Sequence, residues 1–308
     1  MTDHPSRHLV PSGERDLVGH GRDTPVAPWP DAARIAVSLV LNVEEGSEKS
    51  VVDGDPVGES LSEVPPPGVP GERDLTLESV FEYGSRAGVW RLLRLFERQA
   101  VPATIYASAV ALERNPEIAG YLAASDHEVV AHGYRWEEVW KLDIEEEREH
   151  IRLAVDSMMR TIGRRPVGWF CRYAASINTR RLIAEEGGFE YDSDSFADDL
   201  PYLVEVNGRQ WCVVPHAPDT NDLRFFRGSL ATADDFFHYL KDTFETLYAE
   251  GETRPKMMTV SLHARAAGRP GRSPAVDRFI TYAKQHPKVW FARRKEIARV
   301  WKNEFASR

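Results

Sequence analysis

The stretch RIAVSLVLNV, residues 34–43, is an apolar run rich in β-branched and aliphatic side chains, which is typical of a strand. Seven further runs of this kind follow it along the chain. They cover residues 102–110, 127–133, 166–172, 189–195, 211–216, 256–263 and 288–294. The chain therefore offers eight strand candidates, and the segments between them decide how these strands are connected.

Amphipathic helical stretches lie between most of the strand candidates. They span Val89–Gln99, Ile144–Ile162, Thr179–Glu186, Asp234–Ala249 and Ser273–His286. Alternating strands and helices predict an α/β fold with a mainly parallel sheet and helices outside it. Eight strand candidates in one chain favour a distorted (β/α) barrel over an open sheet.

Three segments do not fit this alternation. Residues 1–33 are polar and dotted with prolines, so we expect an extended N-terminal arm, followed by a single barrel domain over residues 34–308. Two long loops are expected at Gly46–Leu75 and Asp198–Gln210, and loops of this length usually carry function or contact a partner subunit.

Composition narrows the class of protein. The net charge of -9 argues against a nucleic-acid or anionic-membrane partner, because both require a basic face. The two cysteines, Cys171 and Cys212, are too few for a disulfide framework and indicate buried thiols in a reducing compartment. The N-terminus has no apolar targeting segment, and no run is long enough to span a membrane, so we expect a cytoplasmic protein.

Titratable side chains stand at the ends of most strand candidates. In a barrel these carboxyl ends meet on one face, where active sites lie. A single histidine at a strand end is more often structural, but the set as a whole is hard to explain by packing. The set comprises Glu44, Glu45, His132, Arg172, Asp192, Asp194, His216, Asp219, His263 and Arg265.

Carboxylates beside histidines serve either in metal ligation or in general acid–base catalysis. A zinc site here would be built on Glu45 and His132 and would need a third ligand one helical turn later, where Trp136 stands. Because Trp136 cannot ligate a metal, the sequence gives only weak support for a metal site. We therefore expect a site without a cofactor, with a Zn²⁺ site as the alternative. Glu44 and Glu45 are adjacent on a strand, so at most one of them faces the barrel axis.

Other side chains near the strand ends are candidates for substrate binding. Arg172 is suited to holding a carboxylate or polarising a carbonyl, although an ion pair with a neighbouring carboxylate is an equally good interpretation. Tyr134 and Trp136 either wall a small planar ligand or cover the top of the barrel.

The order of these motifs resembles the polysaccharide deacetylase family. The acidic pair in NVEEG, HGYRW around His132, GWFCRY around Arg172 and SLH with His263 follow the order of that family's motifs. Glutamates replace its aspartates, and Trp136 replaces its second metal histidine. This pattern, with stretches such as AHGYRW and LHARAAGRPGR, resembles the metal-independent allantoinases and the related cyclic-imide hydrolases.

The resemblance implies a barrel of the polysaccharide deacetylase type that hydrolyses a non-peptide C–N bond, most simply in a small cyclic amide of allantoin size, in purine degradation. Glu44 or Glu45 with His132 would activate water, His263 would protonate the leaving nitrogen, and Arg172 would stabilise charge on the carbonyl oxygen. The expected substrate contacts are Arg172, Tyr134, Trp136, Asp194 and His216. His216 stands where this subgroup has tyrosine, which leaves the substrate open.

The same resemblance implies a homo-oligomer, with a tetramer as one form, that acts on a small molecule. Two other functions remain open at this point. One is a metal-dependent N-deacetylase of acetylated sugars in carbohydrate metabolism, and the other is a catalytically silent barrel that serves as a binding module.

Overall fold

A curled, mostly parallel sheet forms the centre of the computed structural model, which describes residues 9–64 and 69–306. Neighbouring strands follow the order β6-β7-β5-β4-β3-β2-β1-β8, and β9 pairs with β1. The strands are β1 Ile35–Val43, β2 Thr104–Ala107, β3 Glu128–Ala131, β4 Gly168–Trp169, β5 Tyr191–Asp192, β6 Tyr202–Val206, β7 Arg209–Val213, β8 Lys256–His263 and β9 Val289–Phe291. The distorted (β/α) barrel predicted from the sequence is confirmed.

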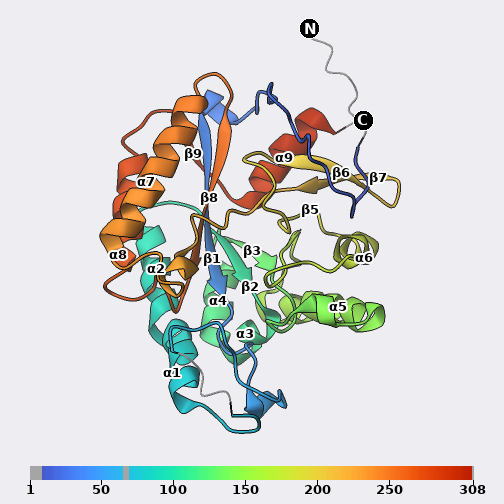
Figure 1. Ribbon diagram of the computed structural model, residues 1–308, viewed down its shortest axis with the longest axis vertical. Coiled ribbons are helices and arrows are strands. Elements are labelled where there is room, and N and C mark those ends of the chain that lie inside the picture. Colours follow the sequence, from blue (N-terminus) through green and yellow to red (C-terminus); the bar gives the residue numbers. More distant parts are fainter. Residues whose placement is uncertain (1–8, 65–68, 307–308) are drawn as a thin grey trace.

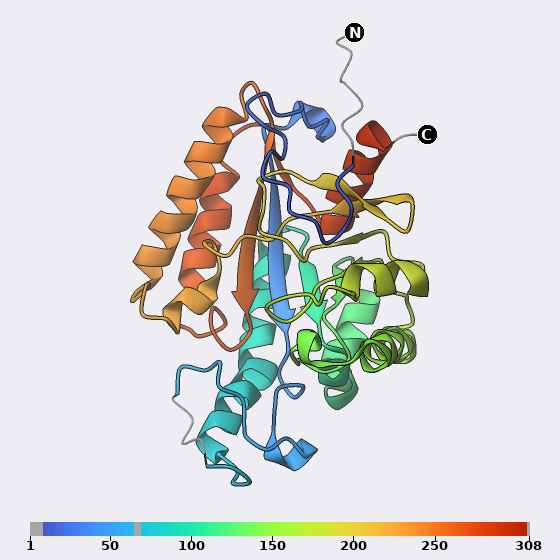
Figure 2. The same ribbon diagram turned by 45° about the vertical axis from the view of Figure 1, so that its right-hand side comes forward.

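The helices lie outside the sheet, with α7 and α8 on one side and α5 and α6 on the opposite side (Figure 1). The turned view in Figure 2 shows the same arrangement. The helices are α1 Leu75–Tyr83, α2 Val89–Arg98, α3 Ala109–Arg114, α4 Pro116–Ala124, α5 Ile144–Ile162, α6 Thr179–Glu186, α7 Ala233–Glu250, α8 Ser273–Ala283 and α9 Arg294–Phe305. All five predicted helices are present within a few residues of their expected ends.

The expected loop at Asp198–Gln210 is wrong, because it contains strand β6. This strand pairs antiparallel with β7, and Asn207 and Gly208 form the turn between them with φ angles of 52° and 73°. Asn-Gly flanked by alternating apolar residues is a strong hairpin signal, since both turn positions require positive φ. The two strands form the edge of the sheet farthest from β8.

Arg294, at the start of α9, bridges the open side of the barrel between β7 and β8. Its guanidinium is fully buried and donates to the carbonyl oxygen of Pro215 after β7 (2.6 Å) and to Oγ1 of Thr259 in β8 (2.9 Å). A third hydrogen bond reaches Oγ of Ser193 after β5 (2.9 Å). One side chain therefore joins strands that do not hydrogen-bond to each other along their length.

The N-terminal segment from residue 9 to residue 33 lies against the end of the barrel where the strands begin (Figure 1). Pro11 bridges to Glu205 of β6, and the Trp29 ring packs against Trp290 and Trp301. The loop after β1 lies at the opposite end, where the strands finish. Within the described residues, no helix combines the length and the apolarity that a membrane span requires. The predicted domain boundary at residue 33 stays a prediction, and residues 1–8 lie outside the described part.

Candidate active site

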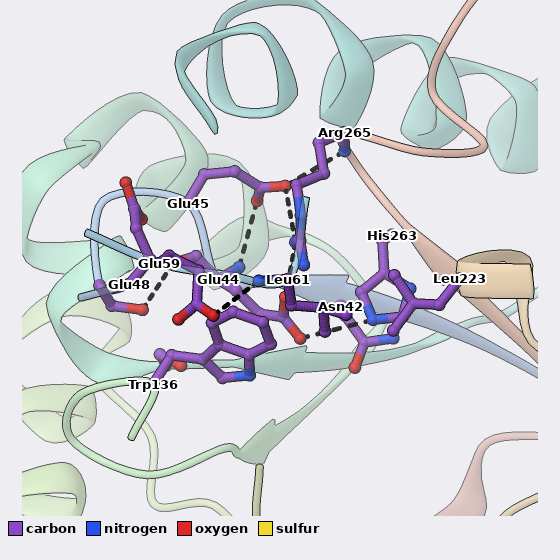
Figure 3. A network of polar contacts seen from close by, with 12 residues as sticks. Asn42, Glu44, Glu45, Glu48, Glu59, Leu61, Trp136, Leu223, His263 and Arg265 are labelled. Carbon is purple, nitrogen blue, oxygen red and sulfur yellow. Dashed lines mark hydrogen bonds and ion pairs between the residues drawn. The ribbon is translucent and has the colours of Figure 1, made fainter. Parts of the chain in front are cut away.

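Alternation along β1 decides which glutamate faces the barrel interior. Val40 packs in the cluster of apolar side chains inside the barrel, whereas Val43 packs in the larger cluster beneath the helices. Glu44 follows the parity of Val40 and points inward, while Glu45 points outward. The same parity turns three other strand-end side chains inward, namely His132, Arg172 and His263. Figure 3 shows Glu44, Trp136, His263 and Arg265 gathered at this end of the strands.

Glu44 is the centre of the cluster. Its Oε1 lies 3.2 Å from Nε2 of His132 and 3.5 Å from Nε2 of His263, so both rings meet at one carboxylate oxygen. Its Oε2 accepts a hydrogen bond of 2.6 Å from Nη1 of Arg265. The strand ends thus bring together two histidines that are 131 positions apart in the sequence.

Burial and charge act in opposite directions on Glu44. Its residue exposure is 1%, against 2% for His132 and 3% for His263. Burial alone would raise the pKa of Glu44, but the positive charge of Arg265, followed by the neighbouring His263 and His132 rings, holds its pKa well below the usual value. Glu44 therefore stays ionised at neutral pH.

Asp222 fixes the orientation of His263. Its Oδ1 lies 2.7 Å from Nδ1 of His263, and its Oδ2 accepts from the backbone N–H groups of His263 (2.7 Å) and Ala267 (2.8 Å). A carboxylate can only accept, so Nδ1 carries the proton and Nε2 faces Glu44. This is the aspartate–histidine arrangement by which many hydrolases hold an acid–base imidazole in one tautomer.

His132 is held in the same tautomer by a different group. Its Nδ1 lies 2.8 Å from the carbonyl oxygen of Phe170, which accepts the Nδ1 proton. The indole Nε1–H of Trp136 donates to its Nε2 at 3.1 Å. Trp136, four residues after His132, therefore occupies the ligand position of the sequence motif and uses the same nitrogen lone pair that a metal would need.

The side chains around Glu44 do not fit a divalent ion. The lone pair of His132 is already used by Trp136, and the guanidinium of Arg265 contacts Glu44 directly, so a metal would be placed against a fixed positive charge. In the described part of the chain, no group of three or more His, Cys, Asp or Glu side chains is arranged to hold a metal ion. The alternative zinc pair of Glu45 and His132 is also separated, because Glu45 faces the other side of β1.

Glu45 contacts backbone rather than the histidines. Its Oε2 accepts from the N–H of Glu44 (3.1 Å), and its Oε1 accepts from the N–H of Arg265 (3.2 Å). Burial is the main cause that raises the pKa of Glu45. Gly84 lies so close that a Cβ there would come within 2.4 Å of Oε1, so a larger residue at that position would displace the Glu45 carboxylate. Glu45 therefore anchors the turn after β8.

Arg172 contacts the cluster through Trp136. Its guanidinium carbon lies 4.0 Å from the centre of the Trp136 ring, and its Nη1 donates to the carbonyl oxygen of Trp136 (2.9 Å). Its Nη2 donates to Oε1 of Glu59 (2.7 Å), and both side chains of this pair are buried. Two of the donor nitrogens of Arg172 are thus engaged by groups of the protein itself.

The other expected substrate contacts lie apart from Glu44. Tyr134 packs against the large core cluster, and Oδ1 of Asp194 accepts from the backbone N–H of Cys171 (2.7 Å). His216 lies inside the barrel with its ring 4.8 Å from that of Phe170, and burial followed by the charge of Arg294 holds its pKa well below the usual value. His216 is therefore neutral, and its ring packs against Phe170 and Tyr106 rather than against Glu44.

Sequence reasoning did not assign roles to three residues of this site: Asp222, Arg265 and Glu59. Arg265 carried a signal, because it stands two residues after His263 at the same strand end. Asp222 begins a short 3-10 helix after a loop, and Glu59 lies within the long loop after β1. Their sequence positions do not reveal that they contact His263 and Arg172.

The loop that follows β1 covers the site. The carbonyl oxygen of Ser47 accepts from the N–H of Trp136 (3.0 Å), and Glu59 reaches Arg172 inside. Four further ion pairs join this loop to the end of the barrel. They are Lys49–Glu138, Asp53–Arg114, Asp55–Arg135 and Glu63–Arg272. Residues 65–68 of this expected loop lie outside the described residues.

Comparison with known proteins gives consistent matches. Residues 72–191 match the family model described as polysaccharide deacetylase. A Schizosaccharomyces pombe protein named "Putative polysaccharide deacetylase" is 36% identical over 310 residues, which cover 93% of this chain and 96% of that protein. A crystal structure named "probable Polysaccharide deacetylase from Pseudomonas aeruginosa PAO1" is 48% identical with a TM-score of 0.90, over 96% of this chain and 99% of that one. The crystal structure of PuuE allantoinase is 46% identical with a TM-score of 0.91, over the same shares of the two chains.

Proposed function

The chain belongs to the polysaccharide deacetylase family, and we propose that it is a hydrolase that opens the C–N bond of a small cyclic amide of allantoin size. The observation that carries this proposal is the meeting of His132 and His263 at one oxygen of Glu44 in a buried site. The similarity to PuuE allantoinase along almost the whole chain supports the choice of substrate class.

The geometry supports a role for each member of the cluster. Ionised Glu44, together with His132, orients a water molecule towards the substrate carbonyl and accepts its proton. Protonated His263, held by Asp222, gives a proton to the nitrogen that leaves when the ring opens. Oε1 of Glu44 lies 3.5 Å from Nε2 of His263, so a negative charge stands beside the nitrogen that gives this proton.

Burial of the site supports a small substrate. Glu44, His132, His263 and Trp136 are each less than 5% exposed, and the loop after β1 covers them. A polymeric sugar needs an open groove in which several rings can lie on either side of the bond that is cut. A ring of five or six atoms can be enclosed completely once the loop has closed over it.

Deacetylation of an acetylated sugar is the second candidate. The names of the Schizosaccharomyces pombe and Pseudomonas aeruginosa relatives favour it. The two reactions use the same chemistry, since each adds water to a carbonyl carbon and expels a nitrogen. They differ in whether the two products remain joined.

A panel of substrates tests the proposal. The purified protein is incubated with allantoin, hydantoin, succinimide and N-acetylglucosamine oligomers, and products are identified by mass. We expect a mass gain of one water on a cyclic amide, without release of a second product. Release of acetate from the oligomers, with no turnover of any ring, would replace the proposal by the deacetylase alternative.

We further propose that the reaction needs no bound metal, because Trp136 and Arg265 take the positions that an ion would use. Prolonged chelation is expected to leave turnover unchanged, and elemental analysis is expected to find far less than one metal per chain. Stoichiometric zinc together with chelator-sensitive turnover would contradict this. Trp136→His, which restores the missing imidazole, is expected to raise the affinity for zinc.

A further inference from the structure

Arg265 is a buried cation at the centre of the site. It follows β8, has no exposed surface, and holds Oε2 of Glu44 at 2.6 Å through Nη1. Its backbone N–H is held by Glu45. Gly88 and Gly268 allow the helices to approach the turn that carries it, since a Cβ at Gly88 would come within 1.9 Å of the carbonyl oxygen of Ala264. Backbone and side chain of Arg265 are therefore both fixed before any substrate arrives.

Two donor nitrogens of Arg265 remain unused. Nε and Nη2 are buried, and neither has a hydrogen-bond partner among the residues that the structure describes. The guanidinium carbon lies 4.7 Å from the centre of the Phe81 ring and 5.0 Å from that of Trp136, so aromatic faces shield it from water. Buried charged donors without an acceptor are costly, and a ligand oxygen would remove that cost.

The other two arginines that are nearly or fully buried differ from Arg265 in this respect. Arg294 has all three of its guanidinium nitrogens engaged by hydroxyl and carbonyl oxygens of the barrel. Arg172 has both terminal nitrogens engaged by Trp136 and Glu59. Among these three arginines of the described part of the chain, only Arg265 both contacts Glu44 and has two guanidinium nitrogens without a hydrogen-bond partner.

We propose that the free N–H edge of Arg265 binds the carbonyl oxygen of the scissile bond and stabilises the negative charge that develops there. This inference rests on the proposed hydrolysis of a C–N bond and changes the expected assignment, which gave this role to Arg172. Arg265 would be a catalytic residue, because it touches the reacting oxygen. Fixed donors of this kind act strongly in a water-excluding site, since they need no reorganisation during the reaction.

The proposed hydrolysis adds water to the carbonyl carbon and then breaks the C–N bond. The water oxygen forms a bond to the carbonyl carbon, its proton passes to the Glu44–His132 pair, and the carbonyl π electrons move to the oxygen that Arg265 holds. The C–N bond then breaks as those electrons return, and the nitrogen takes a proton from His263. One planar guanidinium holds both Glu44 and the carbonyl oxygen, so the base that orients the attacking water and the carbonyl that is attacked are positioned by the same group.

Arg265→Lys and Arg265→Ala test this role, with Arg299→Ala as a matched arginine removal at an exposed ion pair on α9. For both Arg265 variants we expect kcat to fall by at least ~100-fold, as for the loss of an oxyanion donor, with KM changed by less than about threefold. Lysine keeps the charge near Glu44 but cannot present two parallel donors. Added guanidinium is expected to raise the turnover of Arg265→Ala saturably by about tenfold or more, whereas methylammonium and sodium chloride do not.

Several results would overturn the inference. One is Arg265→Lys within about threefold of the wild-type kcat, since charge alone would then suffice. Another is a folded Arg265→Ala, checked by circular dichroism and thermal melting, that guanidinium does not rescue. If the wild-type protein turns over nothing in the panel, the proposed function fails separately. In that case the role of Arg265 is tested by measuring acetate binding by calorimetry. The inference requires that wild type binds acetate and that both Arg265 variants do not. Equal binding of acetate by wild type and the variants would overturn it.

Discussion

Residue by residue, the site depends on which nitrogen of each histidine carries a proton. Asp222 fixes Nδ1–H on His263, and the carbonyl oxygen of Phe170 does so on His132, so both Nε2 atoms face Glu44. The two rings share one carboxylate yet differ in their second contact, because Trp136 donates to His132 alone. This difference supports the proposal that His263, rather than His132, acts as the general acid.

Asp222→Asn should lower kcat by about 100-fold or more, because an amide cannot accept all three hydrogen bonds that hold His263 and its turn. A pH–rate profile checks the role, since loss of the carboxylate should shift the limb that reports His263. Asp219→Asn, an exposed aspartate three residues earlier, is the matched control and should behave as wild type. An unchanged profile in Asp222→Asn would assign Asp222 to structure only.

Asp194 gives a pH-dependent prediction for stability. Burial, followed by the charge of Asp192, raises the pKa of Asp194 from 3.8 to about 7. The folded protein thus binds one more proton than the unfolded chain between pH 4 and pH 7, so its stability falls as the pH rises through this window. Asp194→Asn mimics the protonated carboxyl and should stabilise the protein at pH 8 by up to about 4 kcal/mol, since one pKa unit is about 1.4 kcal/mol.

Thermal melts of wild type and Asp194→Asn at several pH values test this. The difference in melting temperature should grow from pH 5 to pH 8. A constant difference across this range would mean that Asp194 ionises normally in the folded protein.

Among the elements, the side-chain orientations of strand β1 can be predicted from the sequence more fully than the contacts of the loops. Successive side chains on an extended strand point to opposite faces, which predicts that only one of Glu44 and Glu45 faces the barrel interior. Neighbouring core residues in the structure identify it as Glu44. The β6–β7 hairpin differs from the expected loop although Asn207-Gly208 signals a turn, because the strand before the turn has only five residues and directly follows the polar stretch at 198–201. Partners such as Arg265 and Glu59 depend on contacts between distant segments, which no local pattern encodes.

The loop after β1 should open when its buried ion pair is lost. Glu59→Gln removes the partner of Arg172 and leaves a buried guanidinium without a counter-charge, which is more costly than losing an exposed pair. Limited trypsin digestion should therefore cut faster at Lys49 and Arg73, and KM should rise. Glu252→Gln, which breaks the exposed pair with Arg34, is the control and should leave both unchanged. Digestion at the wild-type rate would show that Glu59 does not hold the loop.

At the scale of the whole molecule, the barrel is held by its sheet on one side and by Arg294 on the other. Arg294→Met should lower the free energy of unfolding by about 3–5 kcal/mol, because several buried carbonyl and hydroxyl groups lose their donor together. Arg299→Met, on the same helix but paired with Glu190 at the surface, should cost about 1 kcal/mol or less. Chemical denaturation of both variants measures the contrast, and equal losses would refute the bridging role of Arg294.

The arm and the loop lie at opposite ends of this barrel (Figure 1). The loop covers the site, whereas the arm packs through Trp29 where the strands begin. A role for the arm in a homo-oligomer stays a prediction, as does the oligomer itself. Because the buried site lies at one end of the barrel, the other end is available for such contacts.

The most direct test of the proposed function is ring opening of a cyclic amide by metal-stripped wild type, His132→Ala and His263→Ala, measured per folded molecule. Wild type should turn over allantoin or another member of the panel, and each variant should lose at least ~100-fold in kcat while its melting temperature stays close to that of wild type. Histidine variants that keep their turnover but melt at much lower temperature would contradict the account, because His132 and His263 would then be structural residues.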